Sequence, residues 1–452
     1  MEDKDVTRIH GPEHWAAGPA AAGRPGALTL AHPQPSLLDP RVASLSAVLD
    51  LVRTGRAVTR SQLEVLTGLG RKLVSLRISE LAEVGLVDES GRGPSTGGRA
   101  PRRLRFVAEA GHVLVAHFGA TAAGLAVADL SGRIVAQTRV AHSIGEGPAA
   151  ALEVAFDAWD GLLDARQVRA PVWGIGIAVP GPVEFSTARL VSPPIMPGWH
   201  EFPIRQQVQE RYDAPVWVDN DVNAMALGEL RVGEAAGVQD FLYVKVGTGI
   251  GAGVVSRGGL HRGGQGVAGD VGHIAIREHV GIVCRCGKTD CLEAVAGGGA
   301  LLAAAGRAAR DGASPVLAER LASTGELTVE DLRFAAEHGD TVGLALLTRS
   351  GRLVGEMLAA IVNFFNPSLI VVGGQVAEAA DVLLAGVRQS VYERSLPLAT
   401  RDLRIVRSLH SQVAGVTGSA FTVIDELFSP GVLDRWLGDG SPAGRPELSA
   451  TA

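Results

Sequence analysis

Apolar residues recur at helical spacing near the start of the chain. Gaps of three or four positions predict one helix that Gly55 ends, with an apolar face formed by Val42, Leu45, Val48, Leu49 and Val52. Thr59 is suited to cap a second, shorter helix that runs to Leu66. A third helix is predicted over residues 70–83, and its apolar face is expected to consist of Leu73, Leu76, Ile78, Leu81 and Val84.

The second and third of these helices are joined through a glycine-containing turn, and the third opens with polar residues. This order is typical of a helix-turn-helix, and residues 86–106 predict two strands around an arginine-rich loop, the wing of a winged variant. The residues expected to contact DNA are Arg71, Lys72, Ser75, Arg77, Arg99, Arg102 and Arg103. A three-helix packing module with a solvated charged face is the alternative. The agreement of helix order, turn and wing favours DNA binding.

From residue 109 the pattern changes to strands that alternate with helices. Residues 112–137 predict successive strands around glycine turns, followed by a helix over 149–163 and strands near 172–183 and 215–221. FLYVKV and GTGIGAGVV begin a second such set, with later helices near 299–311, 314–322 and 329–365 and a strand in PSLIVVGG. Two halves that each open with strands and a glycine-rich turn predict duplicated α/β lobes around a cleft.

The predicted domains follow from these changes of pattern. Residues 1–35 are rich in proline, alanine and glycine without periodicity and predict a disordered leader. A winged helix-turn-helix is expected over residues 36–108, the two-lobed α/β domain over 109–430, and a flexible tail over 431–452. No run of about 18 uncharged apolar residues predicts a membrane span.

Charge is divided unevenly along the chain, whose net charge is −6. Residues 41–105 carry 12 Lys and Arg against 6 Asp and Glu, whereas the remainder carries 30 against 42. A basic first part on an acidic body indicates that the first part meets a polyanion such as operator DNA.

All three cysteines of the chain lie close together, at Cys284, Cys286 and Cys291, with His273 eleven positions before the first. Three thiolates and one imidazole match the four ligands of a structural Zn²⁺ site, and Asp270 and Glu293 flank it. The alternatives are three ordinary buried cysteines beside an unrelated histidine, or a disulfide. An odd cysteine count without a secretory signal favours a reducing, cytoplasmic location and therefore a metal site.

Several of these segments together resemble the ROK family, which groups bacterial sugar kinases with sugar-responsive repressors. The resemblance covers residues 37–430, and GDVGH followed by CRCGKTDCLE is its most specific part, with PPIMPGW, VDNDVNAMALGE and VGTGIGAGVV as further matches. It implies a fold like that of actin and hexokinase (ribonuclease H-like) and zinc held by His273, Cys284, Cys286 and Cys291.

The resemblance also implies a sugar or sugar phosphate in the cleft. The residues that would hold it are Asn220, Asp221, Asp270, His273 and Glu293. Carboxylates and amides suit a ligand rich in hydroxyl groups. Asp221 corresponds to the general base of the kinases, and Asp270 stands where the family usually has Glu. For Asn220 and Asp221 alone, a helix cap is the alternative.

One segment departs from the kinases of the family. Their D-x-G-G-T loop is replaced here by residues 117–121, which read HFGAT. His117 is a poor ligand for Mg²⁺, and Ala120 adds a Cβ where a close backbone approach is needed. Phosphoryl transfer depends on positioning and charge neutralisation, so the departure predicts a protein without useful kinase activity.

The sequence therefore predicts a sugar-responsive transcriptional regulator, more specifically a repressor, that acts as a homodimer or homotetramer on operator DNA. A sugar kinase with an added DNA-binding module is the main alternative. A regulator that answers to a partner protein instead of a sugar is the third.

Overall fold

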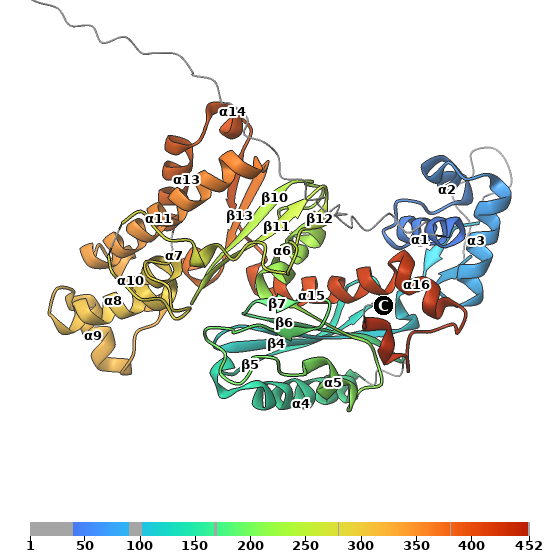
Figure 1. The fold of residues 1–452 in the computed structure, drawn as a ribbon, viewed down its shortest axis with the longest axis horizontal. Coiled ribbons are helices and arrows are strands. Elements are labelled where there is room, and N and C mark those ends of the chain that lie inside the picture. The colour runs from blue at the N-terminus through green and yellow to red at the C-terminus, as the bar shows by residue number, and fades with distance from the viewer. Residues whose placement is uncertain (1–38, 90–101, 167–169, 279, 380, 451–452) are drawn as a thin grey trace, which may run out of the picture. The chain divides into compact units, whose positions relative to one another are not determined.

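A computed structural model of the protein describes residues 39–89, 102–166, 170–278, 280–379 and 381–450. These residues belong to one compact unit, Asp39–Ala452 (Figure 1). The predicted leader over residues 1–35, most of the wing loop and Arg99 lie outside the described residues. No helix among those described is both long and apolar enough to cross a bilayer.

The N-terminal module has the helices and strands expected of a winged helix-turn-helix. Its elements are α1 (Pro40–Arg53), α2 (Arg60–Thr67), α3 (Arg71–Glu83), β1 (Val87–Asp88) and β2 (Arg105–Phe106). The Thr59 hydroxyl caps α2 by accepting from the backbone N–H of Gln62, as its position predicted. Gly68 ends α2 in the left-handed region at φ 69°, which a residue with a Cβ adopts at a cost. The turn between α2 and α3 is thus set by local sequence.

Two five-stranded sheets follow, and each is built in the same order. The first sheet has the order β5-β4-β3-β6-β9 and the second β12-β11-β10-β13-β14. In both, the first strand of the lobe pairs antiparallel with the second and parallel with the fourth. The strands are β3 (His112–Phe118), β4 (Ala122–Asp129), β5 (Ile134–Ala141), β6 (Val172–Val179), β9 (Val216–Asn220), β10 (Phe241–Val246), β11 (Ile250–Ser256), β12 (Gly259–Leu260), β13 (Leu369–Gly373) and β14 (Arg404–Arg407). The duplicated α/β lobes predicted from the sequence are confirmed.

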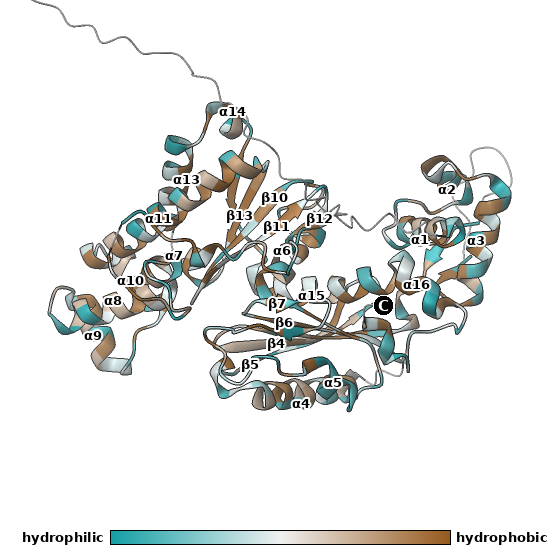
Figure 2. Ribbon diagram, viewed as in Figure 1, coloured by the Kyte–Doolittle hydropathy of each residue, from teal (hydrophilic) through white to brown (hydrophobic). Residues whose placement is uncertain are grey.

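Both sheets are covered on two faces, because their strands are apolar on both sides. Leu114 of β3 packs toward α4 (Pro148–Arg166), whereas Val113 and Val115 pack toward α15 (Ser411–Leu427). In the second sheet, Phe241 and Tyr243 pack toward α6 (Asp221–Val232) and the intervening residues toward the helices of the second lobe. Figure 2 shows the apolar colour along β10 and β13 that this double burial requires.

The helices of the second lobe differ from prediction at one point. They are α7 (Leu292–Ala296), α8 (Gly298–Arg310), α9 (Pro315–Thr324), α10 (Val329–Glu337), α11 (Thr341–Phe365), α12 (Gln375–Ala379), α13 (Asp381–Arg394) and α14 (Pro397–Thr400). The single helix expected over 329–365 is two, because Gly339 adopts φ 79° and the Asp340 carboxylate caps α11 through the N–H of Gly343. The prediction of one continuous helix over 329–365 was therefore wrong.

In each lobe, the helix that follows the last strand of the sheet packs on the sheet of the other lobe. After β9 of the first sheet the chain enters α6, which packs on β10 and β11 of the second sheet. After β14 of the second sheet it enters α15, which packs on β3 and β6 of the first (Figure 1). The helices cross at glycines: a Cβ at Gly418 would lie 1.6 Å from the carbonyl oxygen of Ala224, and one at Gly228 would lie 2.0 Å from that of Ala414. The crossing is therefore as close as two backbones allow.

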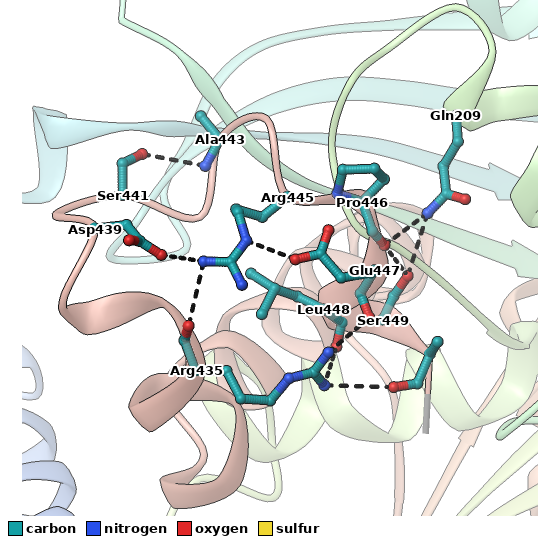
Figure 3. Close-up of polar contacts among 11 residues, drawn as sticks. Gln209, Arg435, Asp439, Ser441, Ala443, Arg445, Pro446, Glu447, Leu448 and Ser449 are labelled. Atoms are coloured by element: carbon teal, nitrogen blue, oxygen red, sulfur yellow. Dashed lines mark hydrogen bonds and ion pairs between the residues drawn. The ribbon is translucent and has the colours of Figure 1, made fainter. Parts of the chain in front are cut away.

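The C-terminal segment is ordered, contrary to the flexible tail expected over residues 431–452. It forms α16 (Pro430–Leu437) and a short 3₁₀ turn (Pro446–Ser449), with Leu433 and Trp436 fully buried. Two arginines tie the end of the chain down (Figure 3): Arg445 pairs with Asp439 and Glu447, and Arg435 donates to backbone carbonyls of the last residues. The spacing of the apolar residues was sufficient for a helix but was not recognised as such.

The N-terminal module and the first lobe share one hydrophobic core. Phe106 of β2 meets Phe428 after α15 edge to face at 6.1 Å, and Trp173 of β6 meets Trp436 of α16 at 5.3 Å. The Ser46 hydroxyl of α1 donates to the carbonyl of Phe428 at 2.8 Å. The module is thus packed directly on the end of α15 and on α16.

We predict that Gly418→Ala destabilises the protein by about 2 kcal/mol, because the added Cβ forces α6 and α15 apart. Helix propensity alone would predict that the alanine variant is more stable than the parent. Urea unfolding followed by circular dichroism measures the difference. The matched control is Gly161→Ala on α4, where a Cβ meets nothing within 4 Å and a gain of about 0.5–1 kcal/mol is expected. A Gly418→Ala variant as stable as the parent would show that the close crossing does not matter.

Candidate functional site

A cleft of about 650 Å³ is lined by residues from both lobes. All five side chains predicted to hold a ligand line it: Asn220, Asp221, Asp270, His273 and Glu293. Asn220 and Asp221 come from the junction of β9 and α6, Asp270 and His273 from a 3₁₀ turn, and Glu293 from the first turn of α7. Residues 73 positions apart in sequence thus line one cleft, as the duplicated lobes predicted, while sugar binding stays a prediction.

Asn220 is the N-cap of α6, so the alternative of a helix cap is correct for this residue. Its Oδ1 accepts from the backbone N–H groups of Val222 at 2.8 Å and Asn223 at 3.3 Å, and its Nδ2 donates to the carbonyl of Gly181 at 3.0 Å. These bonds hold the amide rigidly at the cleft wall. A capping role and a place in the wall are compatible, because these bonds leave the second N–H of the amide free to donate.

Glu293 links the cysteine-containing loop to the second sheet. Its Oε2 accepts from the backbone N–H of Ile250 at 3.0 Å, at the tight turn between β10 and β11. A Cβ at Gly249 would lie 2.4 Å from the same oxygen, which explains why glycine is needed there. The Glu293 carboxylate, which lines the cleft, is therefore tied to the second sheet.

The three cysteines and His273 come together as the sequence predicted. One ligand atom from each of the four residues lies within 4.8 Å of all the others. The Cys284 Sγ lies 3.6 Å from His273 Nδ1, and the Sγ atoms of Cys286 and Cys291 are 3.6 Å apart. Gly287, at φ 86°, allows the turn between the first two thiols and the third.

The donor set fits a divalent metal ion. Burial and the neighbouring thiols raise the pKa of Cys291 to about 12, since three thiolates in one place repel each other. A bound cation removes this cost, and the Cys₃His set can hold one in four-coordinate geometry. His273 faces the cysteines with Nδ1, while its Nε2 lies 3.9 Å from the Asp270 carboxylate, which is also on the cleft wall. The His273 imidazole thus contacts both the cysteine cluster and the cleft.

Asp221 has a partner that sequence reasoning missed. Its buried carboxylate forms an ion pair with the ammonium group of Lys245 from β10. The signal in the sequence was one cation in the otherwise apolar strand FLYVKV. An ammonium group that already donates to the carboxylate competes with a substrate hydroxyl for the same oxygen. The pair therefore weakens Asp221 as a general base but keeps it as a fixed acceptor.

His117 of β3 is half-buried and lines the same cleft. Burial lowers the pKa of His117 to about 4, so the imidazole is neutral near pH 7. A Cβ at Gly415 of α15 would lie 2.2 Å from its Nε2, and that nitrogen has no hydrogen-bond partner among the described residues. A neutral ring wedged between β3 and α15 provides no carboxylate for a magnesium ion.

Comparison with known proteins shows the family to which the chain belongs. The model of the ROK family matches residues 114–426. The chain belongs to the ROK family. A xylose repressor of Caldicellulosiruptor bescii is 30% identical over 390 residues, covering 84% of this chain and 95% of the repressor. A glucokinase of Halalkalibacterium halodurans is 31% identical over 306 residues, covering 68% of this chain and 92% of the kinase.

A solved structure of a ROK protein also resembles most of this chain. The crystal structure of a ROK family transcriptional regulator, a homologue of the E. coli MLC protein, superposes with a TM-score of 0.75 at 25% identity. It covers 88% of this chain and 99% of the regulator. The family match begins at residue 114, so the N-terminal module precedes it. The regulators resemble a larger share of this ROK protein than the glucokinase does.

The basic residues of the N-terminal module divide into an exposed and a buried set. Arg71, Lys72 and Arg103 are exposed, and Arg102, also exposed, lies 3.4 Å from the Glu89 carboxylate. Their contact with DNA stays a prediction. Ser75 is half-buried, and its hydroxyl accepts from the Arg60 guanidinium at 2.9 Å, a contact that sequence reasoning did not foresee.

Arg77 does not fit the predicted role. It is buried on the inner side of α3, where it donates to the Ser44 hydroxyl at 2.8 Å and pairs with Glu80. The reason is helical spacing: Arg77 lies three residues after buried Val74 and four before buried Leu81. Arg77 therefore ties α3 to α1, and the prediction that it contacts DNA was wrong.

We predict that Lys245→Met destabilises the protein by about 3 kcal/mol, because it leaves the Asp221 carboxylate buried without a counter-ion. The double variant Asp221→Asn with Lys245→Met removes both charges and should recover most of that loss. Urea unfolding of the parent, both single variants and the double variant gives the coupling energy. Additive effects would contradict the pairing.

Proposed function

We propose that this ROK protein is a sugar-responsive transcriptional regulator, and more specifically a repressor. Its N-terminal module binds operator DNA through Arg71, Lys72, Ser75, Arg99, Arg102 and Arg103. Its cleft binds a sugar or sugar phosphate through Asn220, Asp221, Asp270, His273 and Glu293. The similarity to a xylose repressor over most of both chains supports this proposal. So does the similarity to the DNA-binding transcriptional dual regulator NagC of Escherichia coli, 26% identical over 397 residues.

The observation that carries the proposal is that one helix touches both sites. Ser411 and Val416, in the first turns of α15, line the cleft. At the other end, Asp425 lies 3.7 Å from Arg53 of α1, and the carbonyl of Phe428 accepts from Ser46. A ligand that changes the angle between the lobes must move α15, because α15 packs on one lobe and emerges from the other. That movement reaches the DNA-binding module through packed side chains.

Zinc is the metal we propose for the four clustered ligands. Three thiolates and an imidazole select zinc over calcium or magnesium, and four protein ligands leave no open position for a reacting water. When bound, zinc supplies a cross-link that shapes the loop before α7. The chain's own residues then hold the ligand: His273 is fixed by one ring nitrogen and Glu293 by the backbone of Ile250.

In this proposal the protein acts as a homodimer or homotetramer, because operators are read as paired half-sites. It acts in the cytoplasm. A glucokinase-like sugar kinase with an added DNA-binding module is the second candidate, and the 31% identity to a glucokinase supports it. The Asp221–Lys245 pair and the neutral His117 argue against it. A regulator that answers to a partner protein is the third.

We expect one sugar or sugar phosphate to change operator affinity by about tenfold, a normal size for coupling between two sites. The operator is selected in vitro from random DNA, and fluorescence anisotropy gives Kd with and without xylose, glucose, N-acetylglucosamine and their phosphates. Glu293→Gln should lose the response and keep operator binding. The matched control is Glu319→Gln, an exposed position on α9 outside the cleft, which should respond like the parent.

Two outcomes would contradict this proposal. ATP-dependent phosphorylation of a sugar that Asp221→Asn abolishes would favour the kinase. Specific operator binding that no sugar alters, with no heat in calorimetry against the same panel, would favour a regulator that answers to a protein.

We expect about one zinc per chain in the purified protein, measured by plasma mass spectrometry. Cys286→Ser should lose the metal, lower the melting temperature and abolish the sugar response together, since the loop that carries Glu293 loses its cross-link. Lys288→Gln, on the same loop but not a ligand, is the control and should keep the metal. A metal-free variant with a normal sugar response would separate zinc from regulation.

A further inference from the structure

One leucine of α3 points away from the module's core. Val74, Ile78 and Leu81 form the buried side of the helix, whereas Leu76 is 51% exposed. At 100° per residue, position 76 lies nearly opposite to positions 74, 78 and 81. Leu76 shares this outward side with Lys72 and Ser79, which are also exposed. The sequence pattern had assigned Leu76 to the apolar face, and the structure places it on the surface.

The polar side chains around Leu76 are mostly engaged within the protein. The Ser75 hydroxyl accepts from Arg60, which is itself paired with Glu89. The Ser79 hydroxyl donates to the backbone carbonyl of Ser75 at 3.1 Å, and Arg77 is buried. The middle of the outward side therefore presents the methyl groups of Leu76 more freely than any hydrogen-bonding group. The start of the helix presents Arg71 and Lys72, for which the described residues provide no acidic partner.

We propose that Leu76 reads the C5-methyl group of a thymine in the major groove of the operator. This inference rests on the proposed function of DNA binding. The major groove is wide enough for a helix, and the thymine methyl is the apolar group that a base pair displays there. Two exposed cations one helical turn before Leu76 bring a polyanion to this side of the helix, which favours DNA over an apolar protein surface. Lys72 or Arg71 then contacts phosphate or guanine while Leu76 covers the methyl.

The test removes the methyl group itself from the DNA. In the operator selected in vitro, each thymine is replaced in turn by deoxyuridine, which pairs in the same way but lacks the C5-methyl. For the parent protein, one symmetry-related thymine per half-site should give about fourfold weaker binding, the effect of uncovering one methyl group. Replacing cytosine by 5-methylcytosine at neighbouring positions should leave the affinity unchanged or lower.

Leu76→Ala should bind the thymine and deoxyuridine operators equally well, with the affinity that the parent has for deoxyuridine or less. Because Leu76 is exposed, this variant should fold, and circular dichroism checks it. The matched control is Val65→Ala on α2, which also removes an exposed apolar side chain from the module and should keep the fourfold difference. A difference that persists in Leu76→Ala, or the absence of any thymine effect in the parent, overturns the inference.

Failure of the proposed function looks different. If the parent selects no operator at all, DNA binding and this inference fall together. If it binds an operator specifically and Leu76→Ala binds it as tightly as the parent, only the inference fails, and the exposed leucine is then a contact for protein.

Discussion

The contact of α6 with α15 is the constraint on which the rest of the structure depends. Gly228 of α6 and Gly418 of α15 bring the two backbones closer than any side chain would permit. Gly415, also on α15, leaves room for the imidazole of His117. Each helix begins in one lobe and packs on the other, so the two sheets are held by a crossing and not by a broad interface. A change in the crossing angle would be transmitted to the cleft and, through the last turn of α15, to the N-terminal module.

The cleft combines polar residues whose charges are already compensated. Lys245 neutralises Asp221, the capping bonds hold Asn220, and the N–H of Ile250 holds Glu293. Groups that are fixed and satisfied in this way bind a polyhydroxylated ligand without rearrangement, because little rotamer freedom remains to be lost. The same compensation works against catalysis, which needs a base free to accept a proton. In the proposed function, these cleft residues therefore serve recognition and not catalysis.

Local sequence was sufficient for much of the fold and for the ligand set. The first three helices, the glycine turn and the strands follow from apolar spacing, and the cysteine cluster follows from the spacing of its ligands. On the core side of α3, Ile78 and Leu81 are buried as predicted. Leu76 was assigned there incorrectly and Val74 was missed, because positions 73 and 76 also recur at helical spacing. The pairing of Lys245 with Asp221 and the place of Gly415 beside His117 arise only when distant segments meet. No pattern within one segment contains that information.

The aromatic contacts between Phe106 and Phe428 and between Trp173 and Trp436 bear on how such regulators diversify. A DNA-binding module attached by a flexible linker could be exchanged for another module without changes in the rest of the protein. Here the N-terminal module and the body are packed on each other, since Leu433, Trp436 and Leu448 near the end of the chain belong to the same core as the first helices. Under the proposed function, a new operator specificity is therefore reached more readily by changes on the outer side of α3 than by recombination. A functional hybrid would have to inherit both ends of the polypeptide from the same parent.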